Sequence, residues 1–141
     1  MSRIYWDTML FIYWLEDNPQ YAKRISQIRS RMKERRDQLL TGAFTFGEVL
    51  AGVYRKRDAQ RAAEVRGLLQ GAVAEILPFD VETADHYARI RAAFGVTPAD
   101  AMHLAAAAQA KADLFLTNDD RLVGKFVPGI QFIVSIKDNV L

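Results

Sequence analysis

Residues 3–15 read RIYWDTMLFIYWL, a β-prone run that leads through Asp7 directly into a long apolar run. Residues 3–6 are typical of a β-strand, because branched and aromatic side chains pack well on a pleated surface. Thr8 is the expected N-cap of a helix over residues 9–15. This helix is apolar around nearly its whole circumference, so more than one of its faces should be covered by the rest of the chain.

The alternation of strand and helix continues along the chain. Apolar residues at steps of four, three and four predict a helix over residues 20–36. Further elements are expected in a regular order, namely strands over residues 38–41, 74–79, 113–117 and 130–134, and helices after Thr45, over residues 81–94 and from Thr97. Strands that alternate with helices predict an α/β fold, with a mostly parallel central β-sheet flanked by α-helices. No repeat or long linker divides the chain, so residues 1–141 are expected to form one domain.

The composition narrows the class of protein. Of the 141 residues, 50% are hydrophobic, which is enough for a sizeable core, and the net charge is +2. The absence of cysteine excludes disulfides and thiolate metal sites and suits a reducing compartment. No apolar run approaches the roughly 20 residues of a membrane helix, and residues 1–7 do not resemble a signal peptide. We therefore expect a soluble cytoplasmic protein that does not bind a membrane.

Four acids far apart in the sequence are expected on one edge of this sheet. Asp7 directly follows the first strand, and Asp119 comes two residues after the strand that ends at Thr117. Glu48 and Asp100 lie in the first turns of two helices. In a parallel sheet, the carboxyl ends of the strands and the first turns of the following helices open on the same side, where ligands bind.

Each of these acids also has a structural explanation. Glu48 completes a capping-box pattern with Thr45, and Asp100 a looser version with Thr97. An acid in a first helical turn gains about 0.3–1 kcal/mol from the helix dipole. Asp7 could cap the helix that follows it. These explanations account for each acid alone, but not for the gathering of all four on one edge.

Gathered carboxylates require a cation or protonation. Two carboxylates about 5 Å apart repel each other by about 3 kcal/mol at an effective dielectric constant of about 20. Hard divalent cations prefer oxygen ligands, and such a cation polarises a phosphate and activates water at neutral pH. The sequence therefore favours a divalent-cation site for phosphodiester hydrolysis, held by Asp7, Glu48, Asp100 and Asp119.

Four segments surround these acids: Tyr5-Trp6-Asp7-Thr8, residues 45–52 (TFGEVLAG), residues 98–105 (PADAMHLA) and Leu116-Thr117-Asn118-Asp119. Together they resemble the acidic motifs of PIN domains, in the order and spacing of VapC-like toxins from bacterial and archaeal toxin–antitoxin pairs. The resemblance implies a parallel sheet wrapped by helices and cleavage of RNA with Mg²⁺ or Mn²⁺. It matches Asp7, Glu48 and Asp100 to the three firmest acids of the family. Asp119 matches the more variable fourth acid, with Asp120 as a competitor for that position.

The same resemblance implies two protein partners, a cognate antitoxin and a second copy of the chain in a homodimer. The helix over residues 9–15 gives a physical reason to expect such partners, because the side that does not pack on the sheet still presents large apolar and aromatic side chains. An exposed apolar patch of this kind often marks a binding site. The alternative is that the helix over residues 20–36, or the helix after Thr45, covers that second side.

The basic residues favour a polyanionic substrate such as RNA. Seven of the 19 lie between Lys23 and Arg36, and a second group lies between Arg55 and Arg66. If a metal neutralises the four site acids, 19 positive charges face 13 negative charges elsewhere, a net +6 that favours contacts with phosphates. Two ordinary solvated helix faces explain the same pattern equally well.

Two other classes of function remain open. A phosphatase of the haloacid-dehalogenase type needs a second aspartate two residues after the first, and Met9 occupies that position. A non-catalytic RNA- or protein-binding module with the same fold would be favoured by loss of an acid, yet all four acids are present. His103, one turn after Asp100, is expected to be a packed or capping residue rather than a catalytic one.

Overall fold

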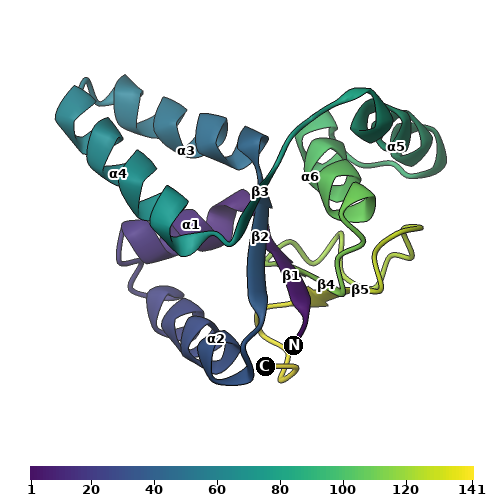
Figure 1. The fold of residues 1–141 in the computed structure, drawn as a ribbon, viewed down its shortest axis with the longest axis horizontal. Helices are drawn as coiled ribbons and strands as arrows, with labels where there is room; N and C mark the ends of the chain where they lie inside the picture. Colours follow the sequence, from purple (N-terminus) through teal and green to yellow (C-terminus); the bar gives the residue numbers. More distant parts are fainter.

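Five parallel strands form a sheet at the centre of the molecule in a computed structural model that describes residues 1–141 (Figure 1). The strands are β1 (Arg3–Trp6), β2 (Gln38–Gly42), β3 (Glu75–Leu77), β4 (Leu114–Thr117) and β5 (Phe132–Ser135). Their order in the sheet is β3-β2-β1-β4-β5. The central strand is therefore β1, which pairs with β2 on one side and with β4 on the other. This arrangement confirms the predicted α/β fold with a parallel sheet.

Six helices cover both faces of the sheet. They are α1 (Thr8–Leu15), α2 (Ala22–Arg35), α3 (Ala43–Arg55), α4 (Ala59–Ala72), α5 (Val81–Ala93) and α6 (Pro98–Gln109). Figure 1 shows α1 to α4 on one face of the sheet and α5 and α6 on the other. None of the six is long and apolar enough to span a membrane.

The side chains of β1 explain why both faces need cover. Ile4 and Trp6 are fully buried in a core that includes α1 and α2, while Tyr5 is fully buried in the opposite core against α6. The ring of Tyr5 stacks on Phe115 of β4, with ring centroids 5.1 Å apart and planes 6° apart. Buried alanines at residues 105–108 let α6 lie close to the sheet. A strand buried on both faces reads as a continuous apolar run, as β1 does.

The first helix is capped by a different residue from the one expected. The N-cap of α1 is Asp7, whose side chain accepts the Met9 N–H at 2.9 Å. A carboxylate is a stronger acceptor for a backbone N–H than a hydroxyl is. The Thr8 hydroxyl is directed elsewhere, to Glu48. The prediction of Thr8 as the cap is therefore wrong.

The third helix begins earlier than expected, so the prediction that Glu48 lies in its first turn is wrong. It starts at Ala43, with Gly42 as an N-cap that makes no side-chain hydrogen bond. The predicted capping box of Thr45 and Glu48 is wrong, because both side chains have other partners. The Thr45 hydroxyl lies 2.8 Å from that of Thr41, and Glu48 reaches across to α1 and α6.

Neighbouring helices cover most of α1. Both α2 and α3 pack against it, and three of its large side chains are buried, namely Leu10, Phe11 and Tyr13. Trp14 lies under the guanidinium of Arg29 on α2, which is 4.5 Å from the centroid of the indole ring. Met9 is the large apolar side chain of α1 that stays exposed, at 42%. The expectation of a broad exposed patch on this helix is therefore wrong, and cover by the two neighbouring helices is the correct alternative.

Basic residues of α2 are engaged within the chain. Arg24 donates to the carbonyl oxygens of Ile136 and Asp138 near the C-terminus, at 2.6 and 2.8 Å. Arg35 forms an ion pair with Asp37 at 3.2 Å. These contacts fasten α2 to neighbouring segments, so Arg24 and Arg35 have a structural role.

A close approach between α6 and the loop before β5 requires glycine at position 129. The backbone of Gly129 has a φ of +101°, a conformation that side chains disfavour. A Cβ atom at this position would lie 2.6 Å from the carbonyl oxygen of Ala108. Any side chain there would therefore push the loop away from the end of α6.

We expect Gly129→Ala to lower the free energy of unfolding by at least about 1–3 kcal/mol, which is the cost of a strained backbone alone. The matched control is Gly67→Ala, because Gly67 is exposed within α4 and a Cβ there meets no atom within 4 Å. This control should raise stability by about 0.5–1 kcal/mol, since alanine is the better helix former. Urea unfolding measures both effects, and equal stability of the two variants would contradict the steric argument.

Candidate functional site

The strand order changes direction at β1, and this change defines where a ligand can bind. From β1 the chain first adds β2 and β3 on one side, and later β4 and β5 on the other. In such sheets, ligands bind in the crevice beyond the carboxyl ends of the strands at this switch point. Asp7 directly follows β1, and Thr117 is the last residue of β4. The Thr117 hydroxyl donates to Asp7 Oδ2 at 2.7 Å, so side chains join the two strand ends.

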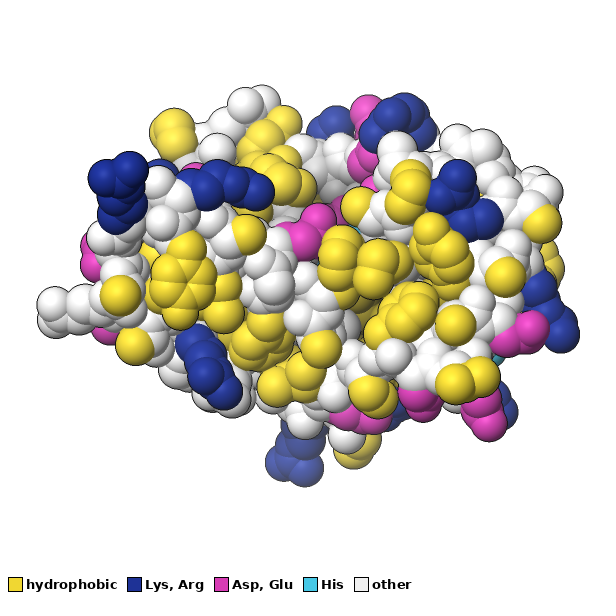
Figure 2. All heavy atoms as spheres, turned by 90° about the horizontal axis from the view of Figure 1, so that it is seen from above, with side chains coloured by type: hydrophobic (Ala, Val, Ile, Leu, Met, Phe, Trp, Pro, Cys, Tyr) yellow, Lys and Arg dark blue, Asp and Glu magenta, His cyan; other side chains and the backbone are white.

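A cavity of about 870 Å³ opens at this position. Its 17 lining residues include every acid that the sequence singles out: Asp7, Glu48, Asp100, Asp119 and Asp120. Figure 2 shows acidic side chains recessed in the hollow between the α3–α4 side and the α5–α6 side of the molecule. Acids from four separate segments of the chain thus lie around one cavity at the carboxyl edge of the sheet.

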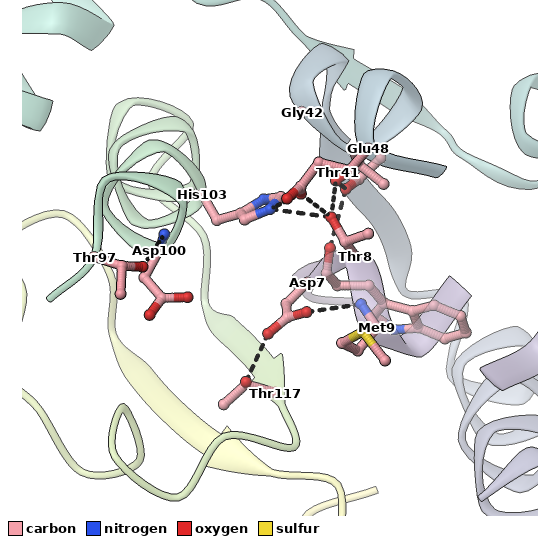
Figure 3. Close-up of polar contacts among 12 residues, drawn as sticks. Asp7, Thr8, Met9, Thr41, Gly42, Glu48, Thr97, Asp100, His103 and Thr117 are labelled. Atoms are coloured by element: carbon pink, nitrogen blue, oxygen red, sulfur yellow. Dashed lines mark hydrogen bonds and ion pairs between the residues drawn. The ribbon is translucent and has the colours of Figure 1, made fainter. Parts of the chain in front are cut away.

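Two donors hold the half-buried side chain of Asp7 (Figure 3). Its Oδ1 accepts the Met9 N–H at 2.9 Å, and its Oδ2 accepts the Thr117 hydroxyl. Burial raises the pKa of Asp7 above its usual value, and the negative charge of Asp100 acts in the same direction, although the two hydrogen bonds oppose the rise. The surroundings of Asp7 therefore disfavour its ionised form on balance.

Glu48 projects from α3 toward α1 and α6. Its Oε1 accepts hydrogen bonds from the Thr8 hydroxyl and from His103 Nε2, the latter at 2.7 Å (Figure 3). Burial alone would raise the pKa of Glu48, but these hydrogen bonds hold it below its usual value. All the hydrogen bonds to this carboxylate involve Oε1, so Oε2 has no donor in the chain.

Asp100 lies in the first turn of α6, as the sequence predicts. Thr97 is the N-cap and accepts the Asp100 N–H at 3.2 Å, and Pro98 is the first helical residue, so both predictions are confirmed. The carboxylate of Asp100 points into the space between α6 and Asp7 (Figure 3), with no hydrogen bond drawn to it. Two carboxylates that face the same space repel each other unless a cation lies between them.

Asp119 and Asp120 differ in their partners. Arg121 contacts Asp119 through two N–H groups, from Nε to Oδ1 at 3.0 Å and from Nη2 to Oδ2 at 2.7 Å. The hydrogen bond from Arg121 holds the pKa of Asp119 below its usual value. Asp120 is 75% exposed and lies 3.4 Å from Lys137 Nζ, whereas the side chain of Asp119 is 25% exposed. This difference favours Asp119 as the fourth acid of the site.

Sequence patterns alone do not reveal the buried polar residues that lie next to the acids and bond to one another. Thr41 and Thr45 are fully buried, with their hydroxyls 2.8 Å apart. The hydroxyl of Tyr5, also fully buried, lies 2.8 Å from His103 Nδ1. Tyr5 and Thr41 lie in strands, where tyrosine and threonine are common, so their presence there does not indicate such contacts. The expectation that His103 is packed is confirmed, but its contact with Glu48 is not foreseen from the sequence.

The donor chemistry of the cavity fits a hard divalent cation. Asp7, Glu48 and Asp100 offer carboxylate oxygens, which Mg²⁺ and Mn²⁺ prefer as ligands. No three acidic or histidine side chains lie close enough together to form a ready-made metal site. Mg²⁺ usually keeps several waters and is bound through one or two carboxylates together with substrate phosphates. The residues therefore fit a cation whose shell is completed by water and substrate, rather than a closed cage of protein ligands.

Comparison with protein families gives a match over most of the chain. A family model described as PIN domain matches residues 4–124. No curated protein matches the sequence.

Solved structures share the fold. VapBC2 from Rickettsia felis, bound to a DNA fragment from its promoter, has a TM-score of 0.76 at 13% identity, over 94% of this chain and 98% of that chain. A toxin–antitoxin complex from Klebsiella pneumoniae has a TM-score of 0.64 at 18% identity, over 90% and 94%. VapBC-5 from Mycobacterium tuberculosis, of the VapBC family of toxin–antitoxin systems, has a TM-score of 0.60 at 22% identity, over 96% and 99%. At these identities the likeness establishes the fold alone.

We expect Asp7→Asn to make the metal-free protein more stable, by on the order of 1 kcal/mol. Asparagine keeps an oxygen that accepts the Met9 N–H but removes a half-buried negative charge. Because folding raises the pKa of Asp7, the ionised carboxylate opposes folding above that raised pKa. This cost disappears as the pH falls toward the usual value of 3.8. The gain in stability should therefore be full at neutral pH and fade toward acid pH.

Thermal unfolding of both proteins in EDTA, from neutral to acid pH, measures this difference. A variant less stable than the wild type at neutral pH would contradict the argument. It would mean that the hydrogen bond from Thr117 stabilises the ionised Asp7 by more than removal of its charge from water costs.

Proposed function

This chain belongs to the PIN-domain family, as its motifs predict, and on that basis we propose that it is a metal-dependent endoribonuclease. The observation that carries the proposal is the cavity at the switch point of the sheet, which acids from four separate segments line. Hydrolysis of a phosphodiester is the reaction that such a set of acids serves best, because both the substrate and the site are anionic and need a shared cation. We place the reaction in the cytoplasm, a compartment that suits a chain without cysteine.

Four acids are assigned to the metal, which we take to be Mg²⁺ or Mn²⁺: Asp7, Glu48, Asp100 and Asp119. When bound, the cation supplies positive charge that polarises the scissile phosphate and activates a water molecule at neutral pH. The Met9 N–H and the Thr117 hydroxyl orient the carboxylate of Asp7.

RNA is the substrate that we propose. Arg55 lines the cavity beside the acids, and its side chain is exposed. Guanidinium groups pair well with phosphate oxygens, so Arg55 is placed to hold the RNA backbone. Arg121 also lines the cavity, but two of its N–H groups are bound to Asp119. No residue of α2 lines the cavity. We therefore assign the phosphate contact near the site to Arg55 rather than to the basic residues between Lys23 and Arg36.

We further propose that the chain is the toxin of a toxin–antitoxin pair. Two of the solved structures that share its fold are named as a toxin–antitoxin complex or system. A cognate antitoxin that holds the nuclease inactive is therefore the protein partner we propose. A homodimer stays a prediction. No surface of α1 can be assigned to it, because Met9 is the large apolar side chain of that helix that stays exposed.

Asp7→Asn should reduce metal-dependent RNA cleavage by at least about 100-fold, because it removes one ligand charge and changes little volume. The matched control is Asp85→Asn, since Asp85 is exposed on α5, pairs with Arg89 and does not line the cavity. This control should cleave at the wild-type rate. The measurement is the rate at which a labelled RNA is cut in the presence of Mg²⁺ or Mn²⁺, with EDTA as the metal-free reference.

Wild-type cleavage by Asp7→Asn, or cleavage that continues in EDTA, would rule out the proposed site. A wild-type protein that binds RNA but cuts it with neither metal would favour the non-catalytic binding module instead.

The fourth acid can be identified by two alanine variants. Asp119→Ala should lower cleavage by about tenfold or more, because Asp119 is the more enclosed of the two acids. Asp120→Ala should leave the rate close to that of the wild type. Single-turnover cleavage rates provide the comparison, and the reverse order would assign the fourth position to Asp120.

A further inference from the structure

A buried histidine joins the acid Glu48 to a tyrosine of the central strand. His103 is only 5% exposed, and its ring packs beside those of Phe44 and Tyr5 at centroid distances of 5.2 and 5.9 Å. Both ring nitrogens have partners. Nδ1 lies 2.8 Å from the Tyr5 hydroxyl, and Nε2 lies 2.7 Å from Glu48 Oε1. The ring therefore cannot turn without losing contacts on both sides.

The direction of these hydrogen bonds follows from Glu48, because an ionised carboxylate can only accept the hydrogen bond with Nε2. In the neutral ring Nδ1 is then an acceptor, and the Tyr5 hydroxyl, which accepts the Gly42 N–H at 3.2 Å, donates its single proton to Nδ1. A neutral imidazole that accepts at Nδ1 carries its proton on Nε2. Nε2–H then donates to Glu48 Oε1, beside the donation from the Thr8 hydroxyl.

We propose that Tyr5 and His103 are positioning residues, which hold Glu48 by one oxygen so that its other oxygen is presented to the cation of the proposed site. The inference rests on the proposed function, because it takes the cation from there. Two donors occupy Oε1 and none occupies Oε2, while Glu48 itself lines the cavity. Partners that orient a metal ligand in this way typically change metal affinity by about 10–100-fold when they are lost.

A packing role alone does not account for the pattern. An apolar side chain would fill the space beside Phe44 without any need to pair two buried ring nitrogens. The backbone at Gly42 also lies close to the Tyr5 hydroxyl. A Cβ atom at Gly42 would lie 3.1 Å from the hydroxyl oxygen, so glycine leaves room for this group. The polar chain from Gly42 through Tyr5 and His103 therefore ends on the one carboxylate that it orients, Glu48.

The tautomer of His103 can be measured without metal or RNA, by ¹⁵N NMR of the imidazole rings at a pH where they are neutral. The chain has 2 histidines, so the half-buried His86 on α5 serves as the internal reference. We expect His103 to carry its proton on Nε2 in the wild type. The Tyr5→Phe variant, which keeps the ring and removes the hydroxyl, should keep this tautomer, because Glu48 still accepts Nε2–H, but its Nδ1 resonance should move because Nδ1 loses its donor. A proton on Nδ1 in the wild type, or an unchanged Nδ1 resonance in Tyr5→Phe, would overturn the proposal.

Binding of Mn²⁺ alone, measured by titration calorimetry, tests the positioning role. His103→Leu should weaken Mn²⁺ binding by about 10–100-fold. His103→Gln should restore most of the affinity, because its amide N–H can donate to Glu48 in place of Nε2–H. His86→Leu is the matched control and should bind Mn²⁺ as the wild type does. Circular dichroism checks that each variant is folded.

The outcomes separate this inference from the proposed function. A wild type that binds no Mn²⁺ would overturn both. A folded His103→Leu with wild-type affinity would overturn the inference and leave the proposed function in place. Equal losses in His103→Leu and His103→Gln would also overturn it, because the ring would then act by packing alone. If His103→Leu does not fold, the tautomer of His103 in the wild type and the Mn²⁺ affinity of Tyr5→Phe decide the matter, with weakened binding expected.

Discussion

The pairing of β1 with a parallel neighbour on each side is the constraint on which the rest of the molecule depends. A central parallel strand needs cover on both faces, and Ile4, Tyr5 and Trp6 meet this need by alternating between two cores. The same pairing sets the order of the sheet, and so the position of the crevice beyond β1 and β4. Asp7 lies where these requirements coincide, since it ends the strand, caps α1 and lines the cavity.

The chain balances the charge of its site acids to different degrees. Asp119 has a guanidinium partner, and Glu48 has a buried histidine and a hydroxyl on one oxygen. Asp7 has only uncharged donors, and the carboxylate of Asp100 faces it without a donor of its own. Of the site acids, Asp7 is the one whose ionised form the fold disfavours, because its burial is not offset by a charged donor. Local sacrifices of stability are common at sites where a ligand recovers the energy on binding.

Sequence patterns predict this structure well wherever the physical cause is local or periodic. The α/β class, the strand at residues 114–117 and the Thr97 cap follow from alternation, hydrophobicity and capping chemistry. The features that cannot be predicted depend on contacts across long separations. Thr8 is a hydrogen-bond donor rather than a cap because Glu48, 40 residues later, faces it. The partners of His103 lie 98 and 55 residues away, so no local pattern identifies them.

The hydrogen bond between Thr117 and Asp7 joins residues that are 110 positions apart, and this separation governs when the site can form during synthesis. Segments near the N-terminus leave the ribosome first, so β1 and α1 are available long before β4. Until then the central strand lacks one of its two neighbours, and the crevice lacks one wall. Pairing of strands so distant in sequence is also slow. The crevice at the carboxyl edge of the sheet is therefore completed only when synthesis of the chain has passed β4.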